Sequence, residues 1–456
     1  MVAAGGQQIG SLWMIRKALL AATLASLPLW ALLSLAGIQP REPYLASKRV
    51  RVGYIGDSIL QGNNLAAADG SLITALANRE LTWAHALYPY FDIDTWIDVS
   101  DAIRHFDGLN AGFAGETTAQ VLARVDRPAR LAPEIMVVSA GINSVVTGVS
   151  AASIESDLQA ICQYYLNRGI KVILSNIRPV GTVFIPDNSS QLTVRKDVNA
   201  WVRTFATTTP NVAFWDVAAA YDDGGGRPLA GYTADGLHPV SLGSQHAALA
   251  LIPIMQRLIA PLAQQTIPDA DNFFPNGRLT GGGGRAGTGV TGRVAHGFSA
   301  QMISPGAKTT VTASTLPNPD TGGDIQEFRF SLHGGESSEV FGLSLRPAGF
   351  DVSALAGKWV KARCRLTLRA WDGWRGINFN TTYMNWSSDA PTTDEMAPKI
   401  NWKLDLETMP FKLPNSPRRI TPLLWIYLHG DHATGDGLVQ IEQLEFFQVS
   451  DPQASR

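Results

Sequence analysis

The sequence predicts an α/β domain built on a mostly parallel sheet with helices on both faces, followed by an all-β domain. Between residues 49 and 265, short apolar segments alternate with segments of helical spacing, which is typical of such a sheet. From Asp269 onward, glycine-rich stretches and strict two-residue alternation replace that pattern. The 456 residues leave room for two or three folded units, since one unit takes roughly 100–200 residues.

Five strands and four helices account for the first domain. The expected strands are Arg49–Ile55, Ile93–Val99, Glu134–Ser139, Lys171–Asn176 and Val212–Val217. The expected helices are Thr117–Val125, Ile154–Arg168, Thr193–Ala206 and Leu242–Leu262. We therefore place the boundaries of this α/β domain at residues 49 and 265.

The rest of the chain has the pattern of a β-sandwich of jelly-roll type. Residues 266–298 are rich in glycine and are interpreted as a linker or the start of the next domain, which covers 299–456. In Lys358–Ala370, apolar residues alternate with polar ones, and the basic residues Lys361, Arg363, Arg365 and Arg369 fall on one face. Pro422–His429 and Gly437–Val449 are two further expected strands.

Residues 1–48 have the features of an export segment. Arg16 and Lys17 precede the uncharged apolar stretch Ala18–Ile38, and Ser34-Leu35-Ala36 is an acceptable cleavage site. The stretch is also long enough to anchor the chain in a bilayer. Cleaved or not, it predicts a periplasmic or extracellular protein, with residues 18–38 as a candidate membrane tether.

Composition excludes several classes of protein. The formal net charge of -2 does not favour nucleic acid as a partner. The two cysteines, Cys162 and Cys364, form neither a zinc motif nor a disulfide framework. No cofactor or metal ion is expected, and the oligomeric state stays open.

Four polar segments follow elements of the predicted parallel sheet. They are Gly56-Asp57-Ser58, the segment from Asn110 to Thr117 that includes Gly115, Gly141-Ile142-Asn143, and Asp235-Gly236-Leu237-His238. Each alone is as readily a turn or a helix cap. Together they supply one complete set of roles at the carboxyl ends of parallel strands, where ligands bind in open α/β sheets.

These residues predict a serine esterase. Ser58 is the nucleophile, His238 is the base that takes its proton, and Asp235 orients the imidazole ring. The backbone N–H groups of Ser58 and Gly115, with the Asn143 amide, form the oxyanion hole. No Gly-x-Ser-x-Gly elbow occurs, so an α/β-hydrolase is not indicated.

At these four segments the sequence resembles the SGNH, or GDSL, hydrolase family. Ser58, Gly115, Asn143 and His238 match the four name-giving positions, and Asp235 matches the triad acid. The resemblance implies a flavodoxin-like α/β/α sandwich and metal-free ester hydrolysis. In one departure, Ser144 replaces the Asp that usually follows the third-block Asn.

The substrate is inferred from the second domain, which is similar to carbohydrate-binding jelly rolls. Its six tryptophans include Trp371, Trp374 and Trp425, expected here as rings that stack on sugars. The simplest combined function is removal of O-acetyl groups from a polysaccharide. The basic face of Lys358–Ala370 is either a solvated strand face or a docking surface for an acidic polysaccharide.

Three other functions stay open at this point. A lipase, lysophospholipase or thioesterase of the same family would use the same triad on longer acyl chains. A polysaccharide O-acetyltransferase would pass the acyl group to a sugar instead of water. A non-catalytic glycan-binding protein would have no reason to keep Ser58, Asp235 and His238 together.

Overall fold

The computed structural model describes most of the chain after residue 48. It covers residues 49–61, 73–76, 80–97, 106–262, 266–345, 349–382, 384–387, 401–431 and 435–452. The predicted export segment, residues 18–38, lies outside the described residues. Within the described ranges, we find no helix with the length and apolar character needed to cross a membrane.

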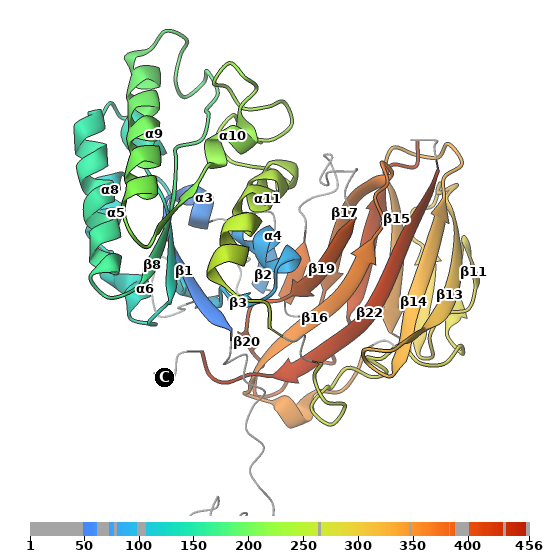
Figure 1. Cartoon of the computed structure of the whole chain (residues 1–456). Coiled ribbons are helices and arrows are strands. Elements are labelled where there is room, and N and C mark those ends of the chain that lie inside the picture. Colours follow the sequence, from blue (N-terminus) through green and yellow to red (C-terminus); the bar gives the residue numbers. More distant parts are fainter. Residues whose placement is uncertain are drawn as a thin grey trace, which may run out of the picture. The chain divides into compact units, whose positions relative to one another are not determined.

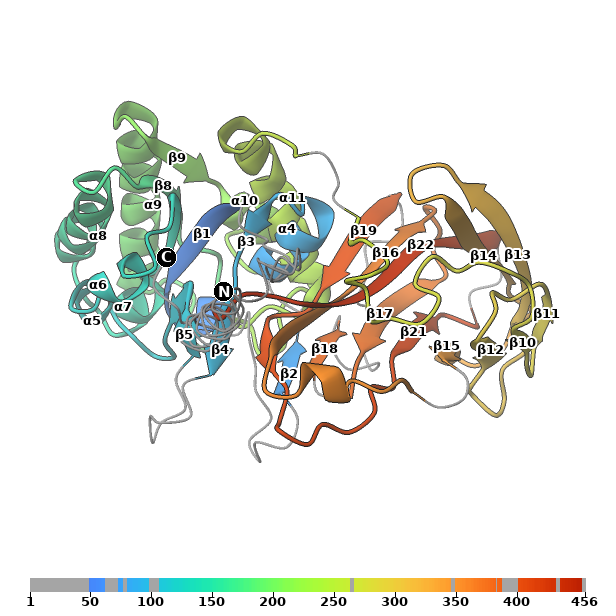
Figure 2. The same ribbon diagram turned by 90° about the horizontal axis from the view of Figure 1, so that it is seen from below.

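The first domain contains the predicted parallel sheet (Figures 1 and 2). Its strands are β1 (Val50–Gly56), β3 (Phe91–Asp92), β6 (Asn110–Gly112), β7 (Ile135–Ser139), β8 (Lys171–Ser175) and β9 (Val212–Trp215). The strand order is β3-β1-β7-β8-β9, and β6 also pairs with β1. Every pair is parallel, so all carboxyl ends of these strands lie at one edge of the sheet.

Helices cover both faces of this sheet (Figure 1). They are α3 (Ser58–Gln61), α4 (Glu80–Leu87), α5 (Thr118–Leu122), α6 (Asp126–Ala129), α7 (Ile142–Val146), α8 (Ala151–Leu166), α9 (Ser190–Thr208), α10 (Val217–Tyr221) and α11 (Ser241–Leu258). Along β7, Val137 belongs to a core shared with α4 and α11, whereas its neighbour Val138 belongs to a core shared with α8 and α9. This alternation is why apolar residues run without a break through β7.

The second domain consists of two sheets with mixed strand order. One contains β10 (Arg285–Ala286), β12 (Phe298–Met302), β15 (Glu339–Leu345), β21 (Leu423–Leu428), β17 (Trp374–Asn380) and β18 (Met384–Ser387). The other contains β11 (Val290–Gly292), β13 (Thr310–Asn318), β14 (Gly323–Ser331), β22 (Asp436–Gln448), β16 (Trp359–Leu368), β19 (Trp402–Glu407) and β20 (Phe411–Lys412). A 3-10 turn, Ser353–Leu355, precedes β16.

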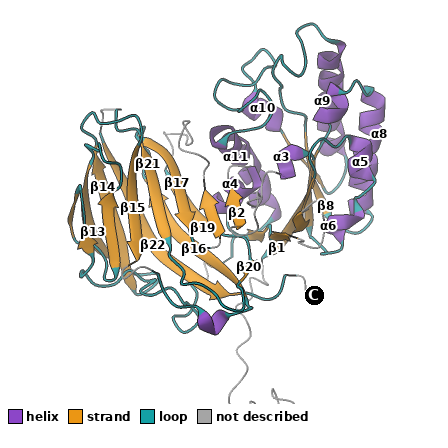
Figure 3. Cartoon of the chain, turned by 180° about the vertical axis from the view of Figure 1, so that it is seen from behind, coloured by secondary structure: helices purple, strands orange, loops and turns teal. Residues whose placement is uncertain are grey.

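Aromatic contacts show that the two sheets face each other. The ring centroids of Phe328 and Phe330 in β14 lie 4.8 and 5.1 Å from that of Phe341 in β15. The apolar face predicted for β16, including Val360 and Cys364, is fully buried in this core. Figure 3 shows the resulting contrast between the strand-rich second domain and the helix-rich first one. The predicted fold classes are thus confirmed.

Two sequence-based boundaries differ from the structure. The strand expected at Ile93–Val99 is β4 (Thr95–Ile97), which pairs with β5 (Phe106–Gly108) outside the parallel sheet. The second strand of the parallel sheet is instead the short β3. Residues 266–298, expected as a linker or domain start, contain β10 and β11, which pair with β12 and β13. They belong to the sandwich because their glycines allow close approach of neighbouring backbones, as at Gly284, where a Cβ would lie 2.2 Å from the Ala295 carbonyl oxygen.

The two domains share an apolar interface. The Trp83 ring of α4 makes an edge-on contact of 5.1 Å with Trp386 of β18 and a 5.7 Å contact with Trp402 of β19. All three rings are fully buried. In addition, β2 (Ile73–Leu76), from the first half of the chain, pairs with β18 and completes the first sheet of the sandwich. The two domains are therefore packed against each other as well as joined through the chain.

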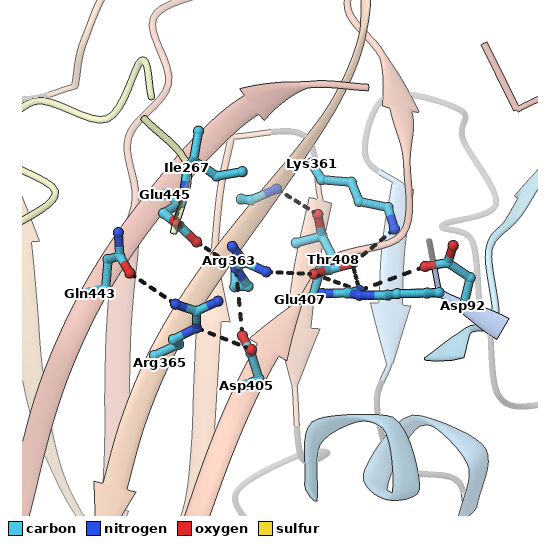
Figure 4. A network of polar contacts seen from close by, with 12 residues as sticks. Asp92, Ile267, Lys361, Arg363, Arg365, Asp405, Glu407, Thr408, Gln443 and Glu445 are labelled. Atoms are coloured by element: carbon cyan, nitrogen blue, oxygen red, sulfur yellow. Dashed lines mark hydrogen bonds and ion pairs between the residues drawn. The ribbon is translucent and has the colours of Figure 1, made fainter. Parts of the chain in front are cut away.

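A buried ionic network continues this interface (Figure 4). Lys361 of β16 donates hydrogen bonds to Asp94 of the first domain, at 2.6 Å, and to Glu407 of β19, at 2.9 Å. Glu407 also accepts from Arg49, which precedes β1, at 3.0 Å. The same carboxylate therefore connects both domains.

We predicted that the basic residues of Lys358–Ala370 form either a solvated face or a docking surface for a glycan. For most of these residues the prediction is wrong. Lys361, Arg363 and Arg365 are 1 to 5 % exposed, and only Arg369 is exposed. Arg363 pairs with Glu445 at 2.5 Å, and Arg365 lies opposite Asp405 in the strand register. These acids, from distant parts of the sequence, neutralise the stripe, so it offers no docking surface for an acidic polysaccharide.

Candidate active site

The candidate nucleophile stands at the carboxyl end of the central strand. β1 ends at Gly56, and Ser58 is the first residue of α3. Its side chain is partly exposed, and its Oγ lies 2.9 Å from Nε2 of His238. Gly56 is required here because a Cβ at this position would lie 1.9 Å from the carbonyl oxygen of Ser139 on β7.

The candidate base and acid lie on the loop before α11. The Oδ2 atom of Asp235 is 2.7 Å from Nδ1 of His238, while its Oδ1 accepts the backbone N–H groups of Leu237 and His238. This turn fixes the carboxylate against the ring. Partial burial opposes ionisation of Asp235, but these hydrogen bonds together hold its pKa below the usual value. A proton held on Nδ1 leaves the Nε2 lone pair facing Ser58.

A neighbouring loop supports the one that carries this pair. Gly181 donates its N–H to the carbonyl of Gly236 at 2.7 Å. Arg227 donates to the carbonyl groups of Val180 and Ile185 at 2.8 and 2.9 Å. The position of the Asp235–His238 turn is thus set by backbone contacts that no sequence motif indicated.

Gly115 and Asn143, the other predicted oxyanion-hole residues, lie close to each other in the structure. Gly115 has a positive φ of 77°, which favours glycine, and it is exposed. Asn143, on α7, donates from Nδ2 to the carbonyl of the next residue, Glu116, at 3.0 Å. The amide carries a second N–H. Their role as oxyanion donors stays a prediction.

Ser144, the departure from the family pattern, is fully buried. Its Oγ accepts the backbone N–H of Thr118 at 2.9 Å, and the Thr118 hydroxyl donates to Asp157 of α8 at 2.7 Å. A serine and a more distant carboxylate therefore bond the start of α5 to α7. This arrangement holds Asn143 near the Gly115 loop without an Asp at position 144.

Arg124 is a positioning residue that the sequence did not reveal. Its guanidinium donates to the carbonyl of Gly56 at 2.9 Å and to Glu116 at 2.6 Å, and it also bonds the carbonyl of Ala111. It thereby joins the ends of β1 and β6 to the loop that carries Gly115. No local motif marks such a residue, because its partners come from two segments, one ending at Gly56 and the other between Asn110 and Thr117.

Below the nucleophile lies a buried polar cluster. Asp57 is 2 % exposed, and burial raises its pKa to about 6, although the Ile59 N–H and the nearby Arg178 charge oppose the rise. Arg178 pairs with Glu80 of α4 at 2.5 Å. Because Ile59 donates to Asp57 Oδ1 at 3.0 Å, the carboxyl group fixes the first turn of α3.

The predicted tryptophan contacts with sugar are mostly wrong. Trp371 and Trp374 are 7 and 2 % exposed and contact each other edge-on at 4.7 Å, so they belong to the sandwich core. Trp425 is partly exposed and stays a candidate. In the described ranges, no three His, Cys, Asp or Glu side chains gather in a way that could hold a metal ion.

A hydrogen-bonded Ser–His–Asp arrangement of this kind is used by α/β ester hydrolases. Residues 54–246 match the model of the GDSL-like Lipase/Acylhydrolase family, so this part of the chain is a GDSL-like lipase/acylhydrolase domain. That family membership implies hydrolysis of esters.

Residues of this chain also align, at low identity, with several solved structures. A GDSL-like lipase from Bacteroides thetaiotaomicron is 17 % identical, with 51 % of this chain and 98 % of that chain covered, at a TM-score of 0.35. A lipase/acylhydrolase from Enterococcus faecalis is 17 % identical, with 47 % of this chain and 100 % of that chain covered, at a TM-score of 0.34. The structure of an acetyl esterase mutant with acetate ion is 22 % identical, with 46 % of this chain and 97 % of that chain covered, at a TM-score of 0.32. No curated protein matches the chain.

Proposed function

We propose that the protein is an exported serine esterase that removes O-acetyl or other short acyl groups from a polysaccharide. The observation that carries the catalytic part is the continuous hydrogen-bonded series of Ser58, His238 and Asp235, with links of 2.9 and 2.7 Å. The family match of residues 54–246 supports the same reaction class.

In this mechanism, Ser58 Oγ attacks the ester carbonyl carbon while Nε2 of His238 takes its proton. Ser58 N–H, Gly115 N–H and the Asn143 amide stabilise the negative charge on the carbonyl oxygen. The C–O bond to the sugar breaks, and His238 returns the proton to the departing sugar hydroxyl. Water, deprotonated by His238, then attacks the acyl-enzyme. The bond between the acyl carbon and Ser58 Oγ breaks, and His238 returns the proton to Oγ as the carboxylate leaves.

The exposure of the site supports a polymeric substrate. Ala114, Gly115 and Asp235 are exposed, and among the described residues no atom beyond the two chain neighbours of Gly115 lies within 4 Å of the position of a Cβ there. A glycan chain can approach such an open site with the acyl group directed at Ser58. The β-sandwich, fixed to the hydrolase domain by Trp83 and Lys361, supplies a second surface for that chain.

A substrate panel tests this proposal. We expect acetate release from at least one acetylated polysaccharide, and rates on p-nitrophenyl esters that fall as the acyl chain lengthens beyond a few carbons. The Ser58→Ala variant provides the blank. Activity that rises with acyl chain length, without acetate release from any glycan, would identify a lipase or thioesterase instead.

We also propose export through residues 18–38, which leaves the enzyme periplasmic or extracellular, as a free or membrane-tethered protein. The basic residues before this stretch and its apolar length support the proposal. Fractionation of producing cells should recover the protein outside the cytoplasm. Deletion of residues 1–38 should retain it in the cytoplasm, and an unchanged location would contradict the proposal.

A further inference from the structure

The β-sandwich holds a polar cavity of about 310 Å³ on the outer side of its second sheet. Its principal lining residues are Asn318, Asp320, Thr321, Arg365, Glu442 and Gln443. They come from the end of β13, the turn before β14, and the neighbouring strands β16 and β22. In β16, the adjacent Cys364 points the other way, into the apolar core.

The floor of this cavity is built from buried polar side chains. Asn318 and Arg365 are each 5 % exposed, and Gln443 is 1 % exposed. Arg365 donates to Asp405 at 3.2 Å and to Oε1 of Gln443 at 3.0 Å (Figure 4). The amide NH₂ is thus the group with which Gln443 can contact a ligand. These hydrogen bonds offset the cost of burying the polar groups and hold the floor of the cavity in one arrangement.

The rim is held in place as well. Asn318 donates to the carbonyl of Glu442 at 3.1 Å, and its Oδ1 accepts the N–H of Asp320 at 3.1 Å. The Glu442 carboxylate accepts the hydroxyl of Thr367 at 3.1 Å. Asp320 itself is exposed, so its carboxylate is accessible at the mouth of the cavity.

The chemistry of the lining selects the class of ligand. The principal lining side chains are all polar, so neither an acyl chain nor a hydrophobic ring would be favoured. Asp320 and Glu442 carry -2 and Arg365 carries +1. Asp405, which pairs with Arg365, adds -1, and Lys403, 3.6 Å from Glu442, adds +1, so the sum is -1. An anionic ligand is therefore disfavoured. A neutral sugar fits, because each hydroxyl both donates and accepts a hydrogen bond.

We propose that this cavity binds one sugar unit of a neutral glycan. The volume lies at the lower end of the roughly 300–1,000 Å³ typical of ligand pockets, which suits a single monosaccharide unit. The inference rests on the proposed function, since the bound glycan would be the polymer that carries the ester. It replaces the acidic polysaccharide expected from the basic residues of β16.

The ionic network gives the cavity a fixed relation to the hydrolase domain. Asp405, which bonds Arg365, lies 3.7 Å from Arg363, and Arg363 lies 3.6 Å from Glu407, the carboxylate shared with the first domain. A sugar held in the cavity would therefore retain the polymer at a set distance from Ser58. Such retention lowers KM for a polymer and has no counterpart for a small ester.

The test uses the full chain and measures binding by calorimetry. Neutral oligosaccharides (xylan-, mannan- and cellulose-derived) are titrated beside oligogalacturonate as the anionic probe. We expect binding to at least one neutral series. Asp320→Arg, which places a long cation at the mouth, should weaken that binding by roughly tenfold or more and raise KM for the acetylated polymer.

The control is Asp431→Arg, which makes the same charge change at an exposed position outside the cavity and should bind like wild type. Asp320→Asn replaces Asp320→Arg if the melting temperature of the latter falls. Wild-type affinity in both Asp320 variants, a preference for oligogalacturonate, or no binding of any neutral series would overturn the inference. Failure of the proposed function is separate: no acetate would be released from any glycan, whatever binds.

Discussion

Ser58→Ala should lower kcat for ester hydrolysis by roughly 10⁴–10⁶ and leave the fold intact. The hydroxyl lies 2.9 Å from His238 Nε2, and its removal leaves no nucleophile for the acyl-enzyme step. Ser58 is the first residue of a short helix and is partly exposed, so its truncation creates no core cavity. The measurement is single-substrate kinetics on p-nitrophenyl acetate, with the melting temperature as the fold check.

Alanine substitutions at the neighbouring residues should lower kcat by different amounts, and these amounts distinguish a catalytic triad from a cleft that is merely polar. His238→Ala should be about as severe as Ser58→Ala, because the members act as a unit. Asn143→Ala should cost only about 10²–10³ in kcat, since two backbone donors remain. Ser156→Ala, at an exposed serine of α8, is the matched control. A rate near wild type in purified Ser58→Ala would contradict the mechanism.

The proximity of these side chains could be predicted because parallel strands bring their carboxyl ends together. Knowing the strands was enough to place Ser58 beside the loop of Asp235 and His238, although 180 residues separate Ser58 from His238. The residues that support the site could not be found in this way. Arg124 and Asp157 act through backbone groups and hydroxyls of other segments, and sequence spacing carries no record of those contacts.

The β16 prediction shows where periodicity stops being informative. Two-residue alternation correctly placed Val360 and Cys364 in the core. It could not tell whether the opposite face contacts water or another domain. Arg363 is neutralised by two acids, Glu445 and Glu407. Both lie on other strands and become its neighbours only through the sheet register. Tryptophan content likewise does not distinguish the buried Trp371 from an exposed sugar-binding ring.

The interface between the domains should prove essential to stability. Lys361→Met should lower the free energy of unfolding by about 3–5 kcal/mol, because it leaves Asp94 without its buried cation and removes one of the cations that pair with the buried Glu407. Arg369→Met is the matched control: it removes a cation from the exposed position just past the end of the same strand and should change stability by only about 0.5 kcal/mol or less.

Acidification should act on the same network. Burial opposes the charge of Glu407, but Arg49 and Lys361 outweigh it and hold its pKa well below the usual value. Because the pKa of Glu407 is lower in the folded state than in the unfolded state, its ionised form stabilises the fold. This contribution is fully present above the unfolded-state pKa of about 4.3 and is lost as the pH falls toward the folded-state pKa. The difference in stability between wild type and Glu407→Gln should therefore shrink on acidification.

Denaturant unfolding, followed by tryptophan fluorescence and by esterase activity, measures both effects. Because Trp83, Trp386 and Trp402 bury one another across the boundary, we expect the two signals to change in a single transition. Lys361→Met should shift that transition as a whole. Two separate transitions, with Lys361→Met changing neither, would instead show that each domain folds alone. The sandwich is an integral part of the enzyme only if loss of one buried cation between the domains destabilises both.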